Sequence, residues 1–155
     1  MLNILSDPAR LRRHITVVFH ERNKGERIFA GDVARDKGAS SVLLLLSQYC
    51  GAMSSRAEPC LVFNKRSEKV RQPGDLCFPG GRITPHLDVW FSKILGLPFS
   101  PLYRWPYWPE WRLLRQHEAR QLAVLLAAGL RESFEEMRLN PLMARFLGPM
   151  PSQNL

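Results

Sequence analysis

Cysteine is scarce in this chain, and its placement excludes several kinds of site. The 155 residues contain three cysteines, Cys50, Cys60 and Cys77, with no Cys-x-x-Cys pair and no metal-ligand spacing to the histidines. An odd number of scattered cysteines is typical of a reducing compartment, where thiols stay free and pack as small apolar side chains. We therefore expect a cytoplasmic protein.

Long hydrophobic runs are also absent. The longest apolar stretches, residues 42–46 and 122–130, fall far short of the roughly 20 residues that cross a bilayer as a helix. Residues 1–5 are too short an apolar run for a secretion signal, and arginines follow at positions 10, 12 and 13. The sequence therefore predicts no transmembrane segment and no secretion signal, and it shows no internal repeat.

Acidic residues are outnumbered by basic ones. The chain has 22 lysines and arginines against 14 aspartates and glutamates, a formal net charge of +8 at pH 7. Such a charge favours polyanionic partners, which include phosphate esters, nucleic acids and anionic membrane surfaces. No basic stripe with base-stacking aromatics accompanies the charge, so we expect no nucleic-acid partner. The length and the 45% hydrophobic content suit one globular domain.

Short elements are predicted on both sides of the middle of the chain. Residues 40–47 form a continuous apolar run between polar residues, which is typical of a buried strand. Residues 60–64 and 74–78 predict two more strands, and residues 143–147 predict the start of another. A capping residue followed by proline predicts a helix over about residues 8–15.

Residues 82–121 differ in composition from the rest of the chain. All four tryptophans lie there with five prolines, so we expect no long regular element before Glu110. The segment is too apolar to be a free linker. Its aromatic side chains either fill a small accessory core, which is the interpretation that we favour, or contact a lipid or an acyl chain.

A helix that starts near Glu110 or Glu118 and ends near residue 138 separates apolar from acidic side chains. Glutamates 132, 135 and 136 lie opposite the apolar stripe, at the i,i+3 and i,i+4 spacings that bring like charges together. An ordinary solvated face explains them, and so does a divalent cation such as magnesium, which binds carboxylate oxygens. Arg131 lies four residues before Glu135 and can orient its carboxylate. The stripe consists of Leu122, Leu126, Leu130, Phe134 and Met137.

Two segments together resemble the signature of the Nudix hydrolases. Residues 74–81 read Gly-Asp-Leu-Cys-Phe-Pro-Gly-Gly, a predicted strand running into a glycine loop. Residues 131–139 read Arg-Glu-Ser-Phe-Glu-Glu-Met-Arg-Leu, which matches the metal-binding helix of that superfamily. With Asn-Lys-Arg-Ser at 64–67 and Val-Arg-Gln-Pro-Gly at 70–74, the chain is most similar to the coenzyme A pyrophosphohydrolases within it.

This resemblance implies a fold, a domain plan and a metal site. The fold is a Nudix-type α/β/α sandwich with a mixed β-sheet, incomplete at its C-terminal side. The single domain, residues 1–155, comprises strands and the Pro-Gly-Gly loop (39–81), an aromatic and proline-rich insertion (82–121) and the metal-binding helix (122–139). Magnesium or manganese would bind three carboxylates, with Arg131 as a further catalytic residue. The implied ligands are Glu132, Glu135 and Glu136, and the implied phosphate contacts are Lys65, Arg66, Arg71, Gly80, Gly81 and Arg82.

The chain departs from the family signature in the spacing of its two halves. Gly81 and Arg131 are 50 positions apart (131 − 81), so an insertion separates the glycine loop from the helix. Ala123 stands where the signature has its outer glutamate. Asp88 or Glu118 can substitute for that glutamate, and the sequence selects neither.

Two further departures follow the carboxylates. Arg138 replaces a glycine that permits a tight exit from the helix, so we expect a different backbone there. The family strands that follow the helix have no counterpart here, which leaves exposed sheet edges. Either the chain is a truncated or split gene product, or a second copy or a partner chain supplies the remainder.

The resemblance implies hydrolysis of a diphosphate linkage in a nucleoside diphosphate derivative, with coenzyme A or acyl-CoA favoured as substrate. The alternative is a catalytically impaired binding or regulatory module on the Nudix fold, which the missing outer glutamate favours. A third hypothesis is a surface-associated protein whose aromatic insertion contacts lipid. Because the insertion starts at the glycine loop and ends in the helix, we expect it to form a flap that shapes the pocket.

Overall fold

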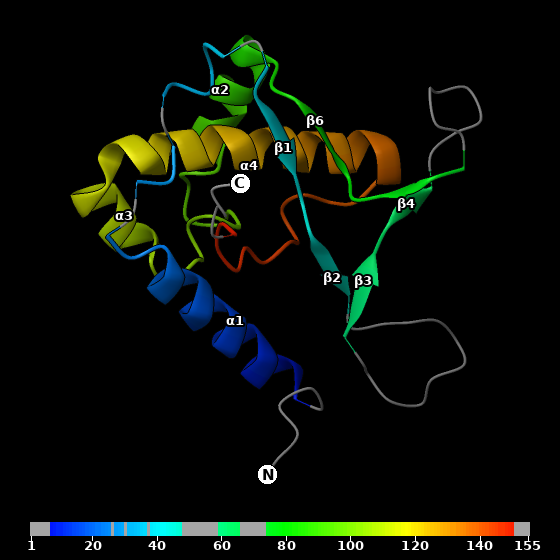
Figure 1. Ribbon diagram of the computed structural model, residues 1–155, viewed down its shortest axis with the longest axis horizontal. Coiled ribbons are helices and arrows are strands. Elements are labelled where there is room, and N and C mark those ends of the chain that lie inside the picture. Colours follow the sequence, from blue (N-terminus) through cyan, green and yellow to red (C-terminus); the bar gives the residue numbers. More distant parts are fainter. Residues whose placement is uncertain are drawn as a thin grey trace.

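The computed structural model describes residues 7–25, 27–29, 31–36, 38–47, 59–65 and 74–150. Within these ranges it contains four helices and six short strands (Figure 1). Two predicted phosphate contacts, Arg66 and Arg71, lie outside the described residues, as does Cys50. The helices are α1 Pro8–Arg22, α2 Pro85–Ile94, α3 Trp108–Leu114 and α4 Gln116–Met137.

Helix α1 starts where the sequence predicts. It continues beyond the predicted end, about residue 15, as far as Arg22. The Asp7 carboxylate accepts hydrogen bonds from the backbone N–H groups of Ala9 (2.9 Å) and Arg10 (3.1 Å), which satisfies two donors of the first turn. The second half of the helix is largely apolar over residues 15–19. Its His20 is buried and stacks on Tyr107 at a centroid distance of 3.6 Å, so a tertiary contact holds this half of the helix against the turn before α3.

Helix α4 is the element against which the other helices of the insertion and two of the strands pack. In Figure 1 it runs across the molecule, coloured yellow to orange, with α2 above it and β1 and β6 crossing it. Helices α2 and α3 and strands β1 Ser40–Val42 and β6 Gly80–Arg82 all contact it. A helix was predicted to start near Glu110 or Glu118; two helices are present instead, with non-helical Arg115 between them.

The end of α4 corrects one prediction. Arg138 adopts the left-handed conformation, with φ 56° and ψ 26°, and its N–H group bonds the carbonyl of Phe134 at 3.0 Å. This is the conformation that glycine usually supplies at a helix C-terminus. The expectation of a different backbone at Arg138 is therefore wrong, and the arginine tolerates a conformation that costs a non-glycine residue roughly 1–2 kcal/mol.

The strands come from three extended segments, each of which pairs with both of the others. The first segment holds β1 and β2 Leu45–Ser47, the second β3 Cys60–Val62 and β4 Asn64–Lys65, and the third β5 Leu76–Cys77 and β6. Strand β1 pairs with β6, β2 with β3 and β4 with β5, all antiparallel. The protein thus combines helices with small antiparallel ladders, while the mixed sheet of a Nudix sandwich stays a prediction.

The run at 40–47 is extended but not buried. Its strand pairing is interrupted at residues 43–44, and the side chains of Val42, Leu44 and Leu46 are exposed. The prediction of a buried strand is wrong because no helix covers the ladder of β2 and β3 among the described elements.

The cysteine prediction is wrong at one position. Cys60 forms a disulfide whose partner lies outside the described residues, whereas Cys77 is a free, half-buried thiol. The argument from free thiols therefore no longer supports a cytoplasmic location, which stays a prediction. In the part of the chain that the structure describes, no helix is long and apolar enough to cross a membrane.

The insertion contains more regular structure than its prolines suggest. Helix α2 spans ten residues and begins with Pro85 in its first turn, where the missing N–H group of proline costs no hydrogen bond. Helix α3 likewise has Pro109 in its first turn. The prediction of no long element before Glu110 is wrong because these prolines start helices instead of interrupting them.

The core lies between the insertion and α4 as far as Leu130, and Leu43, between β1 and β2, packs against it. The side chains of Trp105 and Trp111 are each 1% exposed and meet edge to face at 5.2 Å. Trp90, by contrast, is 60% exposed. The aromatics therefore fill the main core and not a small accessory one. Its buried residues are Leu95, Leu102, Trp105, Trp108, Trp111, Ala119, Leu122, Ala123, Leu126, Ala127 and Leu130.

This core bears on two further predictions, the apolar stripe of α4 and the strand at residues 143–147. The apolar stripe of α4 is buried as far as Leu130, whereas Phe134 is exposed. Residues 143–147 form no strand. Phe146 instead packs edge to face on Trp105 at 5.2 Å, so this segment covers the core as irregular chain.

We predict that Trp105→Ala lowers the free energy of unfolding by about 3–5 kcal/mol, because it leaves a cavity in the centre of the core. Trp90→Ala, the matched change at the exposed tryptophan, should cost less than about 1 kcal/mol. Urea unfolding followed by circular dichroism measures both values. Equal losses in the two variants would contradict this account of the core.

Candidate functional site

The glycine loop and the second half of α4 meet directly. A β-carbon built on Gly81 would overlap the carboxyl group of Glu132, and one on Gly80 would overlap the backbone carbonyl of Ser41. At Gly80 the neighbour is backbone, so only glycine allows β6 to approach β1 this closely, while at Gly81 the neighbour is the end of a flexible side chain. The two halves of the sequence pattern, far apart in the chain, are therefore adjacent in the fold.

Arg131 is the centre of the polar contacts at this junction. Its Nε donates to Asp88 Oδ1 at 2.9 Å and its Nη2 to Asp88 Oδ2 at 3.3 Å, a bidentate pairing. Its Nη1 donates to Glu132 Oε1 at 2.8 Å and to Glu135 Oε2 at 3.3 Å, and Nη2 also reaches the Arg82 carbonyl at 3.1 Å. The guanidinium group thus links α2, β6 and both nearer carboxylates of α4.

This arrangement raises the pKa of Arg131, chiefly because its guanidinium donates hydrogen bonds to the Asp88 carboxylate and further through Glu132, against the opposing effect of burial. The arginine therefore keeps its charge at every pH at which the protein is folded. Asp88 is completely buried, and its carboxylate also accepts the backbone N–H of Thr84 at 2.6 Å.

The structure decides between the two acidic residues that the sequence left open. Asp88 joins the site, whereas Glu118 lies in the first turn of α4, at the other end of that helix. Ala123, where the family signature has its glutamate, is buried in the core. The sequence could not select Asp88 over Glu118, because the contact of Asp88 with Arg131 spans 43 positions and leaves no local pattern.

The three glutamates differ in their surroundings. The side chain of Glu132 is 19% exposed, and that of Glu135 is 53% exposed. Glu136 is exposed, and its Oε2 accepts a hydrogen bond from Asn64 Nδ2 at 3.0 Å. Among the described residues, no three histidine, cysteine or acidic side chains lie close enough together to hold a metal ion.

The predicted phosphate contacts are only partly brought together. Gly80, Gly81 and Arg82 form β6 beside the carboxylates, and Arg82 has an exposed side chain. Lys65 is exposed at the end of β4, next to the Asn64 that holds Glu136.

A shallow groove adjoins Arg131 and Glu135. It has a volume of about 190 Å³ and lies between α2 and the end of α4. Its walls are mostly apolar and include the exposed Trp90 and Phe134. Of the insertion, only α2 lines this groove, whereas Leu95, Leu102, Trp105, Trp108 and Trp111 belong to the core. The lining residues are Leu87, Trp90, Phe91, Arg131, Phe134, Glu135 and Pro141.

Comparisons with family models, with curated proteins and with solved structures found no match for this chain. The Nudix resemblance therefore rests on the residues of the glycine loop and of the carboxylate helix.

We predict that Asp88→Asn lowers the free energy of unfolding by about 3 kcal/mol or more, because Arg131 loses its buried charge partner. Asparagine keeps an oxygen for the Thr84 N–H group, so the loss reports on the ion pair. Glu135→Gln, which breaks a mostly exposed pair with the same arginine, should cost at most about 1 kcal/mol. Thermal and urea unfolding compare the two, and a loss at Asp88 no greater than at Glu135 would remove its assigned role.

Proposed function

We propose that this protein is a Nudix-type hydrolase that cleaves a diphosphate linkage in a nucleoside diphosphate derivative, with coenzyme A or acyl-CoA as substrate. The observation that carries the proposal is the contact between Gly81 and Glu132, held beside the Arg131 network. It joins a glycine loop to a carboxylate-bearing helix, as the family signature implies. We propose the corresponding α/β/α sandwich as the fold and the cytoplasm as its location.

The residue types at the junction fit a magnesium or manganese ion, since carboxylate oxygens are the ligands that these hard cations prefer. Glu132, Glu135 and Glu136 would hold it. Glu135 and Glu136 are exposed, so their side chains can turn away from Arg131 and Asn64 toward a shared ion. Such an ion would polarise the phosphoryl oxygens and lower the pKa of an attacking water.

The chain's own residues then have distinct roles. Arg131 orients the carboxylates of Glu132 and Glu135, and Asp88 fixes Arg131 from the buried side. Glu135 or Glu136 acts as general base. Arg82 and Lys65, both exposed beside the carboxylates, bind the phosphates of the substrate.

The groove between α2 and α4 supports a substrate with an apolar part. Trp90 and Leu87 present exposed apolar surface there, next to Glu135. Burial of such surface by a pantetheine or acyl group would favour coenzyme A derivatives over small nucleotides.

A second candidate function is a binding or regulatory module that has lost turnover. The observation that favours it is the separation of the carboxylates within the described residues, together with the alanine in place of the outer glutamate. A homodimer or a partner chain would suit either function, since the extended segments expose Leu46, Leu61 and Phe63.

We predict that the protein releases 3′,5′-ADP and phosphopantetheine from coenzyme A only with magnesium or manganese. The double variant Glu135→Gln, Glu136→Gln should lose about 100-fold or more of this activity, because the ion loses two charged ligands. A control with Glu21→Gln and Glu118→Gln removes the same charge elsewhere and should keep its activity. Ligand binding without any hydrolysis by the wild type would support the module instead.

We also predict that Trp90→Ala raises KM for coenzyme A about tenfold, because one aromatic contact of roughly 1.5 kcal/mol is lost. The KM for ADP-ribose, which lacks the pantetheine arm, should change much less. Leu113→Ala on α3, an exposed apolar residue outside the groove, serves as control. Parallel kinetics for the two substrates test this, and an equal change in both would exclude the groove from substrate recognition.

A further inference from the structure

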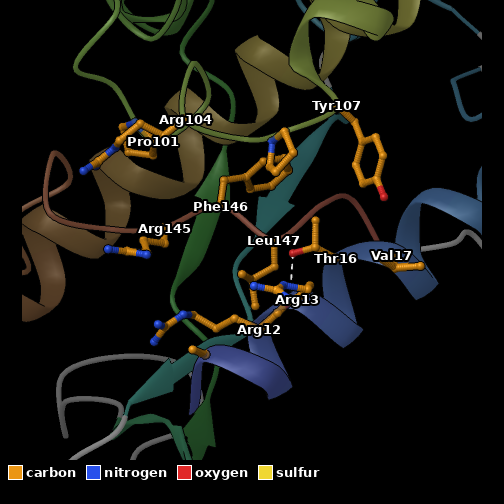
Figure 2. Close-up of a pocket in the computed structure, with 12 residues that line it drawn as sticks. Arg12, Arg13, Thr16, Val17, Pro101, Arg104, Tyr107, Arg145, Phe146 and Leu147 are labelled. Carbon is orange, nitrogen blue, oxygen red and sulfur yellow. Dashed lines mark hydrogen bonds between the residues drawn. The ribbon is translucent and has the colours of Figure 1, made fainter. Parts of the chain in front are cut away.

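A second cavity, with a volume of about 520 Å³, lies apart from the carboxylates. Small-molecule sites typically measure about 300–1,000 Å³. Its walls come from α1, from the turn at residues 101–107 and from residues 145–147, so three distant segments build it (Figure 2). It shares no lining residue with the groove at Trp90.

The charge of this cavity is entirely positive. Arg12 and Arg13 reach it from α1, Arg104 from the turn and Arg145 from the last segment, and none of the described lining residues carries a carboxylate. In the part of the chain that the structure describes, the side chains of Arg12, Arg13 and Arg145 make no hydrogen bond or ion pair. Guanidinium groups gathered without counter-charge repel one another, and an anion placed among them removes that repulsion.

Arg104 differs from the other three arginines of the cavity because its guanidinium group is hydrogen-bonded. Its guanidinium donates to the carbonyls of Leu142 (2.6 Å), Ala144 (3.0 Å) and Ser100 (3.3 Å). These bonds tie the turn to the segment that carries Arg145, which sets the wall of the cavity before any ligand arrives. A site that is already formed loses less free energy to ordering when it binds.

The remaining walls are apolar. In the view of Figure 2, Arg12, Arg104 and Arg145 lie along one side, while Phe146 and Leu147 lie at the centre and Val17 on the other side. The planar fork of arginine pairs with two oxygens of a phosphate group. A single carboxylate group has two oxygens and so can pair with only one such fork. Three arginines without partners therefore suit a ligand that has more anionic oxygens than one carboxylate.

We propose that this cavity binds a small organic diphosphate, such as a nucleoside diphosphate, with its phosphates among Arg12, Arg13 and Arg145 and its carbon skeleton on the apolar side. The site is distinct from the proposed hydrolase centre and does not depend on turnover there. The cavity binds the ligand without breaking any of its bonds.

The test is isothermal titration of the full chain in EDTA, which removes the metal that the proposed hydrolysis needs. ADP should bind, inorganic pyrophosphate more weakly and adenosine not measurably. The triple variant Arg12→Gln, Arg13→Gln, Arg145→Gln should weaken ADP binding at least about tenfold. The matched triple Arg22→Gln, Arg112→Gln, Arg120→Gln removes the same charge from exposed positions outside the cavity and should change it less than about threefold.

If both triple variants weaken ADP binding equally, the binding reflects only the net charge of the protein and the proposal is overturned. ADP binding that neither triple variant alters would overturn it as well. Tight binding of a short oligonucleotide through the three arginines, with no binding of ADP, would make the surface a nucleic-acid interface and also overturn it. The double variant Glu135→Gln, Glu136→Gln should bind ADP like the wild type in EDTA, which separates the cavity from the carboxylate site. If the triple variant unfolds, Arg145→Gln alone, at an exposed side chain without contacts, must still weaken binding.

Discussion

The packing of Trp105 and Trp111 against the first half of α4 is the interaction on which the arrangement of the other elements depends. This packing buries the aromatic part of the insertion. Helix α3 then lies at the start of α4, and α2 lies beside the last turns of α4. Helix α4 is consequently core as far as Leu130. The last part of the helix carries Glu132 and Glu135 beside the strands.

The insertion and the carboxylates are joined by one buried ion pair. Asp88 is fully buried on α2, and a buried carboxylate needs a cation nearby because its desolvation is otherwise uncompensated. Arg131 supplies the charge and uses its remaining N–H groups on the glutamates. The segment from 82 to 121 is therefore essential to the fold. It provides much of the core, and its Asp88 positions Arg131 at the site.

The two candidate sites have opposite charge, which follows from the distribution of the net +8. Three glutamates on one helix repel a diphosphate unless a cation lies between them, whereas the arginine-lined cavity attracts anions directly. The positive surface would draw polyanions to the protein from solution. Of the two sites, only the carboxylate site would need a metal to accept them.

Patterns carried by neighbouring residues were predictable from the sequence. The apolar stripe of α4 from Leu122 to Leu130, the glutamates on its other side and the extended segments at 60–64 and 74–78 all follow from local periodicity. The exposure of residues 40–47, the disulfide of Cys60, the helix at Pro85 and the exit at Arg138 did not follow from it. Each depends on what a segment packs against or on the backbone that packing imposes.

By itself, the sequence determined which residues share a helix face and which segments are extended, because backbone geometry fixes the period of a helix and of a strand. Only the tertiary structure decided that the insertion forms the core and that Asp88 pairs with Arg131. It alone also decided that arginines from three segments share a cavity. Asp88 and Arg131, for example, are 43 positions apart, and no local spacing encodes which distant partner a buried charge or an aromatic ring will meet.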